Sequence, residues 1–457
     1  MKRVLGLVLV LALTAVGGAI AYQAAAREHQ YRLLLSRGDL ALGDGQTFGA
    51  IEAFSGAIAL RPDSMLAHLK RGETYRQRGD LDAAARDFRR AAALDPSATR
   101  PLEALGDVLY QRQRFQAAAE AYRSRLDLDD RSEQVAYRLA LARYRDGDID
   151  AALAALTHAT RLSDRLPDAH YLIGLCLRER KQLPDAVKAF ETAVALAPGM
   201  IPAREELAEG YRALGRRADE IEQLQYIALL DRANAERQVA VGLAHARAGQ
   251  GELAVLTLGN ALERTPDQPQ VYAALGRVWL DMAAVRSDAL SKALEALERV
   301  ASTAAATSEV MTLYGRALLK AEQPEAAERA LQQATTRYPV DPEAFLAYAD
   351  VAEQQHHLAA ARTALIAHGN LVGNDETFAA RATEIARLSM RLNEPSAAAA
   401  WFERASDAAP ADLEILTALA DAHMKAGDRD RARAAIARGL ERDPQDAGLL
   451  AWSRRVR

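Results

Sequence analysis

The chain has 457 residues, of which half are hydrophobic, only 5% are aromatic, and 26% are charged with a formal net charge of −4. This near balance leaves no basic surplus that would indicate nucleic acid and no acidic block that would indicate a disordered tail. The single cysteine, Cys176, excludes an internal disulfide and a zinc ribbon, and we expect it to be a small buried side chain. Abundant Ala, Leu, Glu and Arg favour helix, and no sustained alternation typical of strands occurs.

The N-terminus carries two positive charges followed by residues 4–22, which are uncharged and mostly apolar. Nineteen residues are enough to span a bilayer core, but the densest apolar run covers only the first thirteen, and an A-x-A pattern follows it. For residues 1–30 we therefore predict either a membrane anchor or a signal peptide cleaved near Ala21, followed by a short linker. Both alternatives place the rest of the chain outside the cytoplasm, because Lys2 and Arg3 hold the short end inside.

A period of 34 residues runs through the rest of the chain. Pro62 and Pro96 are 34 residues apart, Pro96 and Pro198 are 102 apart, and Pro198 and Pro266 are 68 apart. Two later proline gaps exceed 68 by five and three residues, which predicts a small insertion in each. Glycine recurs at the fifteenth position of the unit, at Gly45, Gly79, Gly147, Gly215, Gly249 and Gly427. A period sustained this long predicts a repeat architecture.

Each repeat shows two helical stripes separated by a turn. The second stripe follows the spacing i, i+4, i+7, as in Ala84, Phe88 and Ala91. Glycine suits the left-handed residue after a helix end, and proline ends the second helix. We expect small residues at positions 8 and 20 to let the two helices approach, and a large residue at position 24 to fill the space toward the next repeat. One helix pair cannot bury its own apolar face, so neighbouring repeats must stack.

The stretch from Gly72 to Pro96 resembles the tetratricopeptide repeat family in the positions of its glycine, tyrosine, alanine, phenylalanine, alanine and proline. The resemblance extends over about twelve repeats in residues 31–446, with Glu220 replacing the usual alanine in the sixth, and implies an all-α fold, a right-handed superhelical α-solenoid of helix-turn-helix repeats. Residues 447–457 are expected to form a C-terminal capping helix. The expected repeat starts are Tyr31, Met65, Thr99, Glu133, Pro167, Ile201, Ala235, Pro269, Ser308, Pro342, Ala379 and Leu413.

The sequence contains no motif typical of catalysis. The phosphate loop G-x-x-x-x-G-K-[ST], the G-x-S-x-G elbow and the H-E-x-x-H zinc motif do not occur. The nine histidines are scattered, and we expect His356 and His357 to lie in a solvated turn rather than in a metal site. We therefore expect no enzyme, with no catalytic residues, cofactor, metal or small-molecule substrate.

The resemblance implies that the first helices line a concave groove with positions 2, 5, 9, 12 and 13. In the third to fifth repeats these positions hold tyrosine and arginine, which interfaces favour. The candidate partner-binding residues are Arg100, Tyr110, Tyr137, Tyr144, Tyr171 and Arg178. The alternative is that the tyrosines are core side chains that are partly exposed to solvent. Later groove positions mix acids and bases, and neither the carboxylate clamp nor the asparagine ladder of some relatives is present.

The expected function is a non-catalytic protein–protein interaction scaffold of the bacterial cell envelope, on the periplasmic side. It would be anchored in the inner membrane or secreted after cleavage, and would support assembly of an envelope complex; that placement is analogy. Its expected partners are other proteins, including a membrane-embedded complex, and not nucleic acid. If residues 4–22 are uncleaved, they contact the inner membrane. The alternative function is an accessory or regulatory subunit of a membrane enzyme, or of an exopolysaccharide or pilus export system.

Overall fold

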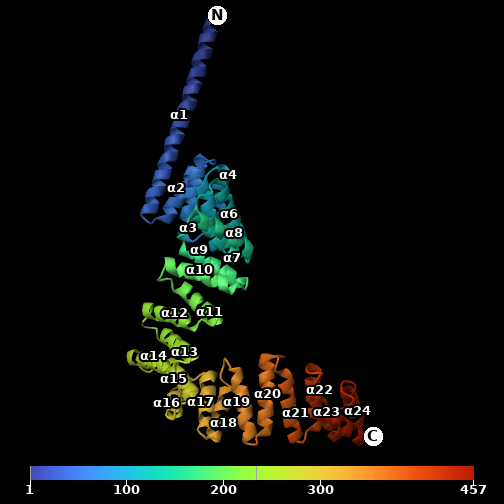
Figure 1. The fold of residues 1–457 in the computed structure, drawn as a ribbon. Helices are drawn as coiled ribbons and strands as arrows, with labels where there is room; N and C mark the ends of the chain where they lie inside the picture. Colours follow the sequence, from blue (N-terminus) through green and yellow to red (C-terminus); the bar gives the residue numbers. More distant parts are fainter. Residues whose placement is uncertain (1, 233, 457) are drawn as a thin grey trace. The chain divides into compact units, whose positions relative to one another are not determined.

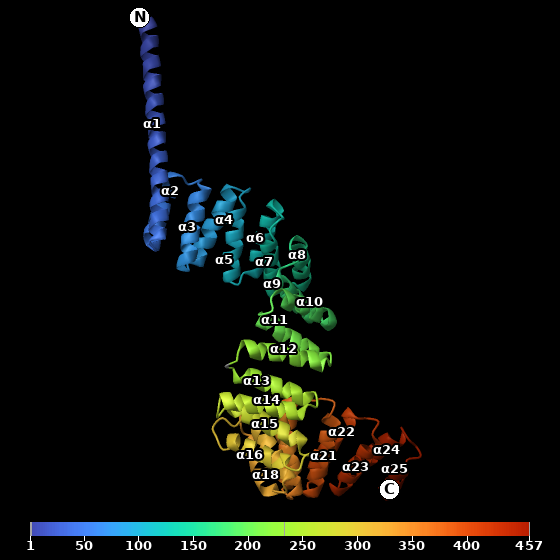
Figure 2. The ribbon, with the colours of Figure 1, turned by 60° about the vertical axis from the view of Figure 1, so that its left-hand side comes forward.

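The protein is described by a computed structural model that gives the backbone of residues 2–232 and 234–456, with side chains from residue 16 onward. Over these residues the chain forms 25 α-helices and no strand (Figure 1). The helices follow one another as antiparallel hairpins, and consecutive helices from α2 to α8 lie side by side in chain order (Figure 2). The predicted fold class, an all-α solenoid of helix-turn-helix repeats, is confirmed.

The chain divides into two compact parts, residues 1–223 and 224–457, which we call the N-terminal part and the C-terminal part. The boundary falls inside α12 in the sixth repeat. The helices up to this boundary are α1 (Lys2–Gly43), α2 (Thr47–Leu60), α3 (Met65–Arg78), α4 (Leu81–Leu94), α5 (Thr99–Gln111), α6 (Phe115–Leu128), α7 (Glu133–Arg145), α8 (Ile149–Leu162), α9 (Pro167–Glu179), α10 (Leu183–Leu196), α11 (Ile201–Ala213) and α12 (Arg217–Leu230).

The C-terminal part continues the same alternation of first and second helices. Its helices after α12 are α13 (Ala235–Arg247), α14 (Gly251–Arg264), α15 (Pro269–Met282), α16 (Ala289–Ala301), α17 (Ser308–Lys320), α18 (Pro324–Ala334), α19 (Pro342–Gln354), α20 (Leu358–Val372), α21 (Phe378–Arg391), α22 (Pro395–Ala408), α23 (Leu413–Lys425), α24 (Arg429–Leu440) and α25 (Ala447–Arg455).

The first helices of repeats two to twelve begin where the sequence places the repeat starts, except that α21 begins at Phe378, one residue early. The two predicted insertions fall in the repeats with the longer connections, residues 283–288 after α15 and residues 373–377 after α20. The last helix packs on the repeat before it, because Leu449 is fully buried and lies against Gly439.

The first repeat differs from the expectation, because α1 has no break between residues 2 and 43. Residues 23–30, which we expected to be a linker, are helical and lead directly into the repeat, where Tyr31 is buried. From residue 16 onward, no helix is long and apolar enough to cross a membrane. Most of the predicted targeting segment, residues 4–22, precedes that range and so lies outside the described side chains.

The two helices of a repeat meet where position 8 faces position 24. A Cβ atom added to Gly72 would lie 2.7 Å from the Phe88 ring, and one added to Gly174 would lie 2.3 Å from the Phe190 ring. Such distances are shorter than real contacts, so the ring occupies the space of the missing side chain. The same close approach recurs in the pairs Gly38–Phe54, Gly106–Tyr122, Gly242–Leu258, Gly276–Leu297 and Gly315–Leu331.

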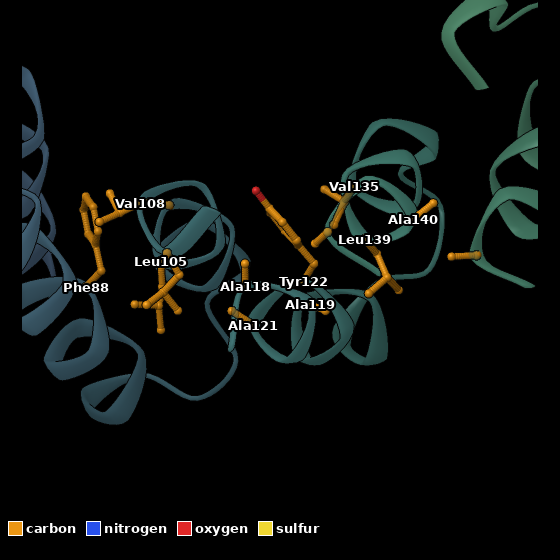
Figure 3. Close-up of a cluster of buried hydrophobic side chains, with 14 of the residues drawn as sticks. Phe88, Leu105, Val108, Ala118, Ala119, Ala121, Tyr122, Val135, Leu139 and Ala140 are labelled. Atoms are coloured by element: carbon orange, nitrogen blue, oxygen red, sulfur yellow. The ribbon is translucent and has the colours of Figure 1, made fainter. Parts of the chain in front are cut away.

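Position 20 supplies the second small residue. It is a fully buried alanine in eleven repeats, at Ala50, Ala84, Ala118, Ala152, Ala186, Ala254, Ala293, Ala327, Ala361, Ala398 and Ala432. Glu220, its counterpart in the sixth repeat, is also buried. The large residues continue the core from repeat to repeat, since Phe88, Val108, Tyr122 and Val135 belong to one cluster across the second to fourth repeats (Figure 3).

Position 15 takes the left-handed backbone conformation in eleven of the twelve repeats, whether or not it is glycine; Ala283 in the eighth repeat has φ −63°. The six glycines that recur there have φ between 72° and 86°. Five repeats place another residue in the same conformation, namely Gln113, Lys181, Glu322, His356 and Asn393, with φ between 57° and 63°. The turn geometry is therefore set by the helix hairpin, and glycine only makes it easier to adopt.

Adding one methyl group at the helix contact should destabilise the fold. We expect Gly174→Ala to lower the free energy of unfolding by about 1–3 kcal/mol, because the new Cβ overlaps the Phe190 ring. The measurement is chemical unfolding followed by circular dichroism. In the control, Gly259→Ala, the added Cβ meets no atom within 4 Å, and better helix propensity should raise stability by up to about 1 kcal/mol. Equal behaviour of the two variants would contradict the proposed contact.

At position 15, replacing another residue by glycine should stabilise the fold, whereas replacing glycine by alanine should destabilise it. We expect Lys181→Gly to raise the free energy of unfolding by up to about 1 kcal/mol, because glycine removes the strain of a side chain at φ 60°. Gly79→Ala should lower it by about 1 kcal/mol, although a Cβ there meets no atom within 4 Å. Thermal melts of the two variants test this, and a stabilised Gly79→Ala would show that the turn is not left-handed in solution.

Candidate partner-binding groove

Three of the predicted tyrosines lie close together on the first helices of the third to fifth repeats. Tyr110 on α5, Tyr137 on α7 and Tyr171 on α9 are half-buried and pack on the underlying core. Burial raises the pKa of Tyr137 to about 12, and Asp168, Tyr110 and Tyr171 add smaller electrostatic contributions to that shift. The rings are held from below, since Tyr110 meets Phe115 edge-on with centroids 5.3 Å apart.

Tyr144 and Arg178 belong to the same surface. Burial raises the pKa of Tyr144, and Glu179 adds to this shift while Arg178 opposes it. Burial likewise raises the pKa of Tyr171, with Glu206 adding to the shift and Arg178 opposing it. Arg178 thus lies beside both rings, and its guanidinium pairs with Glu206 on α11. We call Tyr110, Tyr137, Tyr144 and Tyr171 the tyrosine strip.

Arg100, the sixth predicted residue, is separate from the tyrosine strip. It lies at the start of α5, ten residues before Tyr110, which corresponds to about 15 Å along the helix. Its guanidinium pairs with Glu73 on α3 at 2.8 Å. The structure therefore brings together five of the six predicted residues and places Arg100 in a neighbouring ion pair.

The hydroxyl groups of the tyrosine strip differ from those of the core tyrosines. Tyr122 donates a hydrogen bond to Asp107 at 2.7 Å, and Tyr211 donates one to Glu191 at 2.7 Å. In the described part of the chain, none of the four strip hydroxyls has such a partner. Because the strip rings are packed while their polar ends are unpaired, the strip has the composition of a contact surface.

Several other groove charges are paired between neighbouring repeats. A residue at position 9 pairs with one at position 2 or 6 of the next repeat, which gives a ladder of ion pairs along the groove. Its members are Asp39–Lys70 at 2.6 Å, Glu73–Arg100 at 2.8 Å, Asp107–Arg138 at 3.2 Å, Arg316–Glu343 at 2.8 Å, and Arg277–Glu309. The ladder is replaced by leucine at position 9 in three repeats, at Leu141, Leu175 and Leu243. The first two adjoin the tyrosine strip.

The third leucine, Leu243, lines a pocket that the sequence analysis missed. The pocket has a volume of about 280 Å³ and is formed by α13, α15, α17 and the connection before α17, all within the C-terminal part. Its sequence signal is Ala273, the smallest residue at position 5 of any repeat. A single alanine in an alanine-rich chain is too common to be noticed without coordinates.

The residues that the structure describes contain no side-chain cluster suited to a metal ion. No cluster of three or more His, Cys, Asp or Glu side chains suited to a metal ion occurs among them. His357 lies in the turn before α20 with its Nδ1 atom 2.7 Å from Glu328, and it is exposed. Cys176 is fully buried, and burial raises the pKa of its thiol to about 11.

Comparison with family models identifies the class of protein. One model described as "Tetratricopeptide repeat" matches residues 35–99, 69–132, 137–201 and 313–367, and a second with the same description matches residues 389–451. Together they cover more than half of the chain, which therefore belongs to the tetratricopeptide repeat family. This fold is that of a scaffold for contacts between proteins, as the sequence predicts.

Solved structures similar to this chain include the crystal structure of MamA, which is 24% identical over 38% of this chain and 94% of that chain, with a TM-score of 0.36. YrrB, described as a TPR protein with an unusual peptide-binding site, is 21% identical over 40% and 93%, with a TM-score of 0.35. The pilF protein of Pseudomonas aeruginosa is 20% identical over 45% and 94%, with a TM-score of 0.36. A search of curated proteins gives no match.

The unpaired strip hydroxyls lead to a prediction about stability. Tyr137→Phe should change the free energy of unfolding by less than about 0.5 kcal/mol, because no hydrogen bond of the described protein is lost. Tyr122→Phe should lower it by about 1 kcal/mol or more, because Asp107 loses its hydrogen bond from the hydroxyl. Parallel unfolding curves measure both variants. Equal losses would mean that Tyr137 is a core tyrosine like Tyr122.

Proposed function

We propose that this protein is a non-catalytic scaffold of the bacterial cell envelope that acts on the periplasmic side. It binds partner proteins through the groove of its repeats and so supports assembly of an envelope complex. The observation that carries the proposal is the tyrosine strip: packed aromatic rings with unpaired hydroxyls on the first helices of a protein-binding repeat fold. The charged start and apolar residues 4–22 support the envelope placement.

The strip is suited to a partner that contributes shape and hydrogen bonds rather than charge. Tyrosine offers a large, rigid area with a polar end, and such residues carry much of the energy at interfaces. Arg178, one of the cations beside the strip, already pairs with Glu206, so a partner gains little from adding a carboxylate there. Contacts at Arg178 should therefore depend weakly on salt, whereas Arg145, which also lies near Tyr144, offers a second positive charge.

The course of α1 favours a partner at the membrane if residues 4–22 are retained. Residues 23–30 are helical and continuous with the first repeat, and eight helical residues span about 12 Å. The first repeat would then lie close to the bilayer surface. On this basis the second candidate is an accessory or regulatory subunit of a membrane enzyme, or of an exopolysaccharide or pilus export system.

The test is recovery of partners from the native envelope. The full chain with a C-terminal tag is cross-linked in cells, extracted in mild detergent and analysed by mass spectrometry. We expect the chain to fractionate with the envelope and to recover a defined set of envelope proteins. Recovery should fall about tenfold or more when Tyr137 and Tyr171 are both changed to alanine, because each lost ring removes over 1 kcal/mol.

The matched control changes Tyr137 and Tyr171 to phenylalanine, which keeps the packed rings, and it should retain most of the binding. Undiminished recovery by the folded double alanine variant would remove the strip as the binding surface. Fractionation of the full chain with the cytoplasm would overturn the envelope placement. Recovery dominated by one integral membrane enzyme or export component would support the second candidate over the first.

A further inference from the structure

The pocket beside Leu243 exists because one groove side chain is small. Position 5 of the repeat is tyrosine at Tyr137 and Tyr171 and leucine in three other repeats, and these side chains fill the space between adjacent first helices. In the eighth repeat the same position is Ala273, which is half-buried on α15 and lines the pocket. The pocket of about 280 Å³ is thus the space that a larger residue occupies elsewhere in the array.

The walls of the pocket are apolar and its rim is polar. Val239 and Leu243 on α13, together with Val310 and Leu313 on α17, contribute aliphatic surface. Val300, at the end of α16, is buried and adds to the same wall. A large side chain entering from the groove would exchange water for aliphatic contacts, at roughly 25 cal/mol per Å² of apolar surface removed from water.

The two charges at the rim of the pocket form a pair, because Arg277 on α15 pairs with Glu309 on α17. Both residues, with Thr307 and Leu313, also line a second hollow of about 490 Å³ that continues along the groove toward α19. There Arg316 on α17 pairs with Glu343 on α19 at 2.8 Å, and the carboxylate of Asp341 caps α19. A charged side chain entering the first pocket would have to break the Arg277–Glu309 pair, so this pocket is complementary to an uncharged side chain.

The spacing of the two hollows fits an extended chain. They lie in successive intervals between first helices, and packed helices are about 8–10 Å apart. An extended segment advances about 3.3 Å per residue, so three residues cover one interval. One side chain can fill the first pocket while the third residue beyond it lies over the second hollow.

We infer that the pocket lined by Ala273 binds one large apolar side chain, aromatic or leucine-like, from an extended and uncharged segment of a partner polypeptide. The inference rests on the proposed function in taking the partner to be a protein. It adds a second binding site, confined to the C-terminal part, whereas the tyrosine strip lies wholly in the N-terminal part.

The test uses the full 457-residue chain as bait for a phage-displayed library of random 12-residue peptides. We expect enriched peptides to share one Leu, Phe, Tyr or Trp at a fixed place and to carry little net charge. Synthetic copies, measured by fluorescence polarisation, should bind at least tenfold more weakly to Ala273→Tyr, in which the protein fills its own pocket. If that variant fails to fold, Ala273→Leu is the second pocket-filling variant, because the second repeat has leucine at the same position, Leu69.

The matched control is Thr383→Tyr, which introduces the same residue at position 5 of the eleventh repeat, away from the pocket, and should bind the peptides like the wild type. Peptides that bind pocket-filling variants undiminished, enrichment of strongly charged peptides, or no enrichment at all would overturn the inference. So would binding of dodecanoic acid in the pocket without any peptide.

The outcomes separate this inference from the proposed function. Selected peptides that lose binding when Tyr137 and Tyr171 are changed to alanine, but not in Ala273→Tyr, would overturn the pocket assignment and leave the scaffold function standing. Peptides that depend on Ala273, from a chain that fractionates with the cytoplasm, would support the pocket and overturn the envelope placement.

Discussion

The architecture depends on the contact between a glycine on the first helix of a repeat and a large side chain on the second helix. In seven of the twelve repeats a glycine at position 8 leaves its helix backbone bare, and a phenylalanine, tyrosine or leucine at position 24 fills that space, as Phe190 does against Gly174. The other five repeats have alanine at position 8. Because the ring lies where a Cβ would be, the distance between the two helices of the hairpin is fixed within narrow limits. Repeats built on the same distance present the same faces to one another and can stack.

This contact does not involve the groove face of the first helices, and there the repeats differ. At position 9 an ion pair with the next repeat can be replaced by leucine, as at Leu175 and Leu243. At position 5 a tyrosine can become an alanine, which converts a filled surface into a pocket at Ala273. The candidate binding surfaces are thus departures from the repeat pattern on the face that the fold does not use.

Electrostatics narrows the class of partner. Several arginines of the groove pair with acids one repeat away, including Arg178 with Glu206 and Arg277 with Glu309. Ion pairs of this kind, partly exposed to solvent, add little to stability, but each pair carries no net charge. A partner selected by this groove gains its affinity from aromatic and aliphatic contact, with hydrogen bonds to the strip hydroxyls supplying orientation.

The sequence alone determined the features that depend on residues close together in the chain. The starts of the first helices in repeats two to twelve followed from the 34-residue period to within one residue, since caps, turns and stripes act over a few positions. Only the tertiary structure decided what depends on residues about 30 apart in adjacent repeats. The pairing of Arg100 with Glu73 and the pocket at Ala273 are of this kind. The left-handed turn at Lys181 could not be predicted from the sequence either, because the position has no glycine. The packed hairpin imposes that conformation on whichever residue occupies the position.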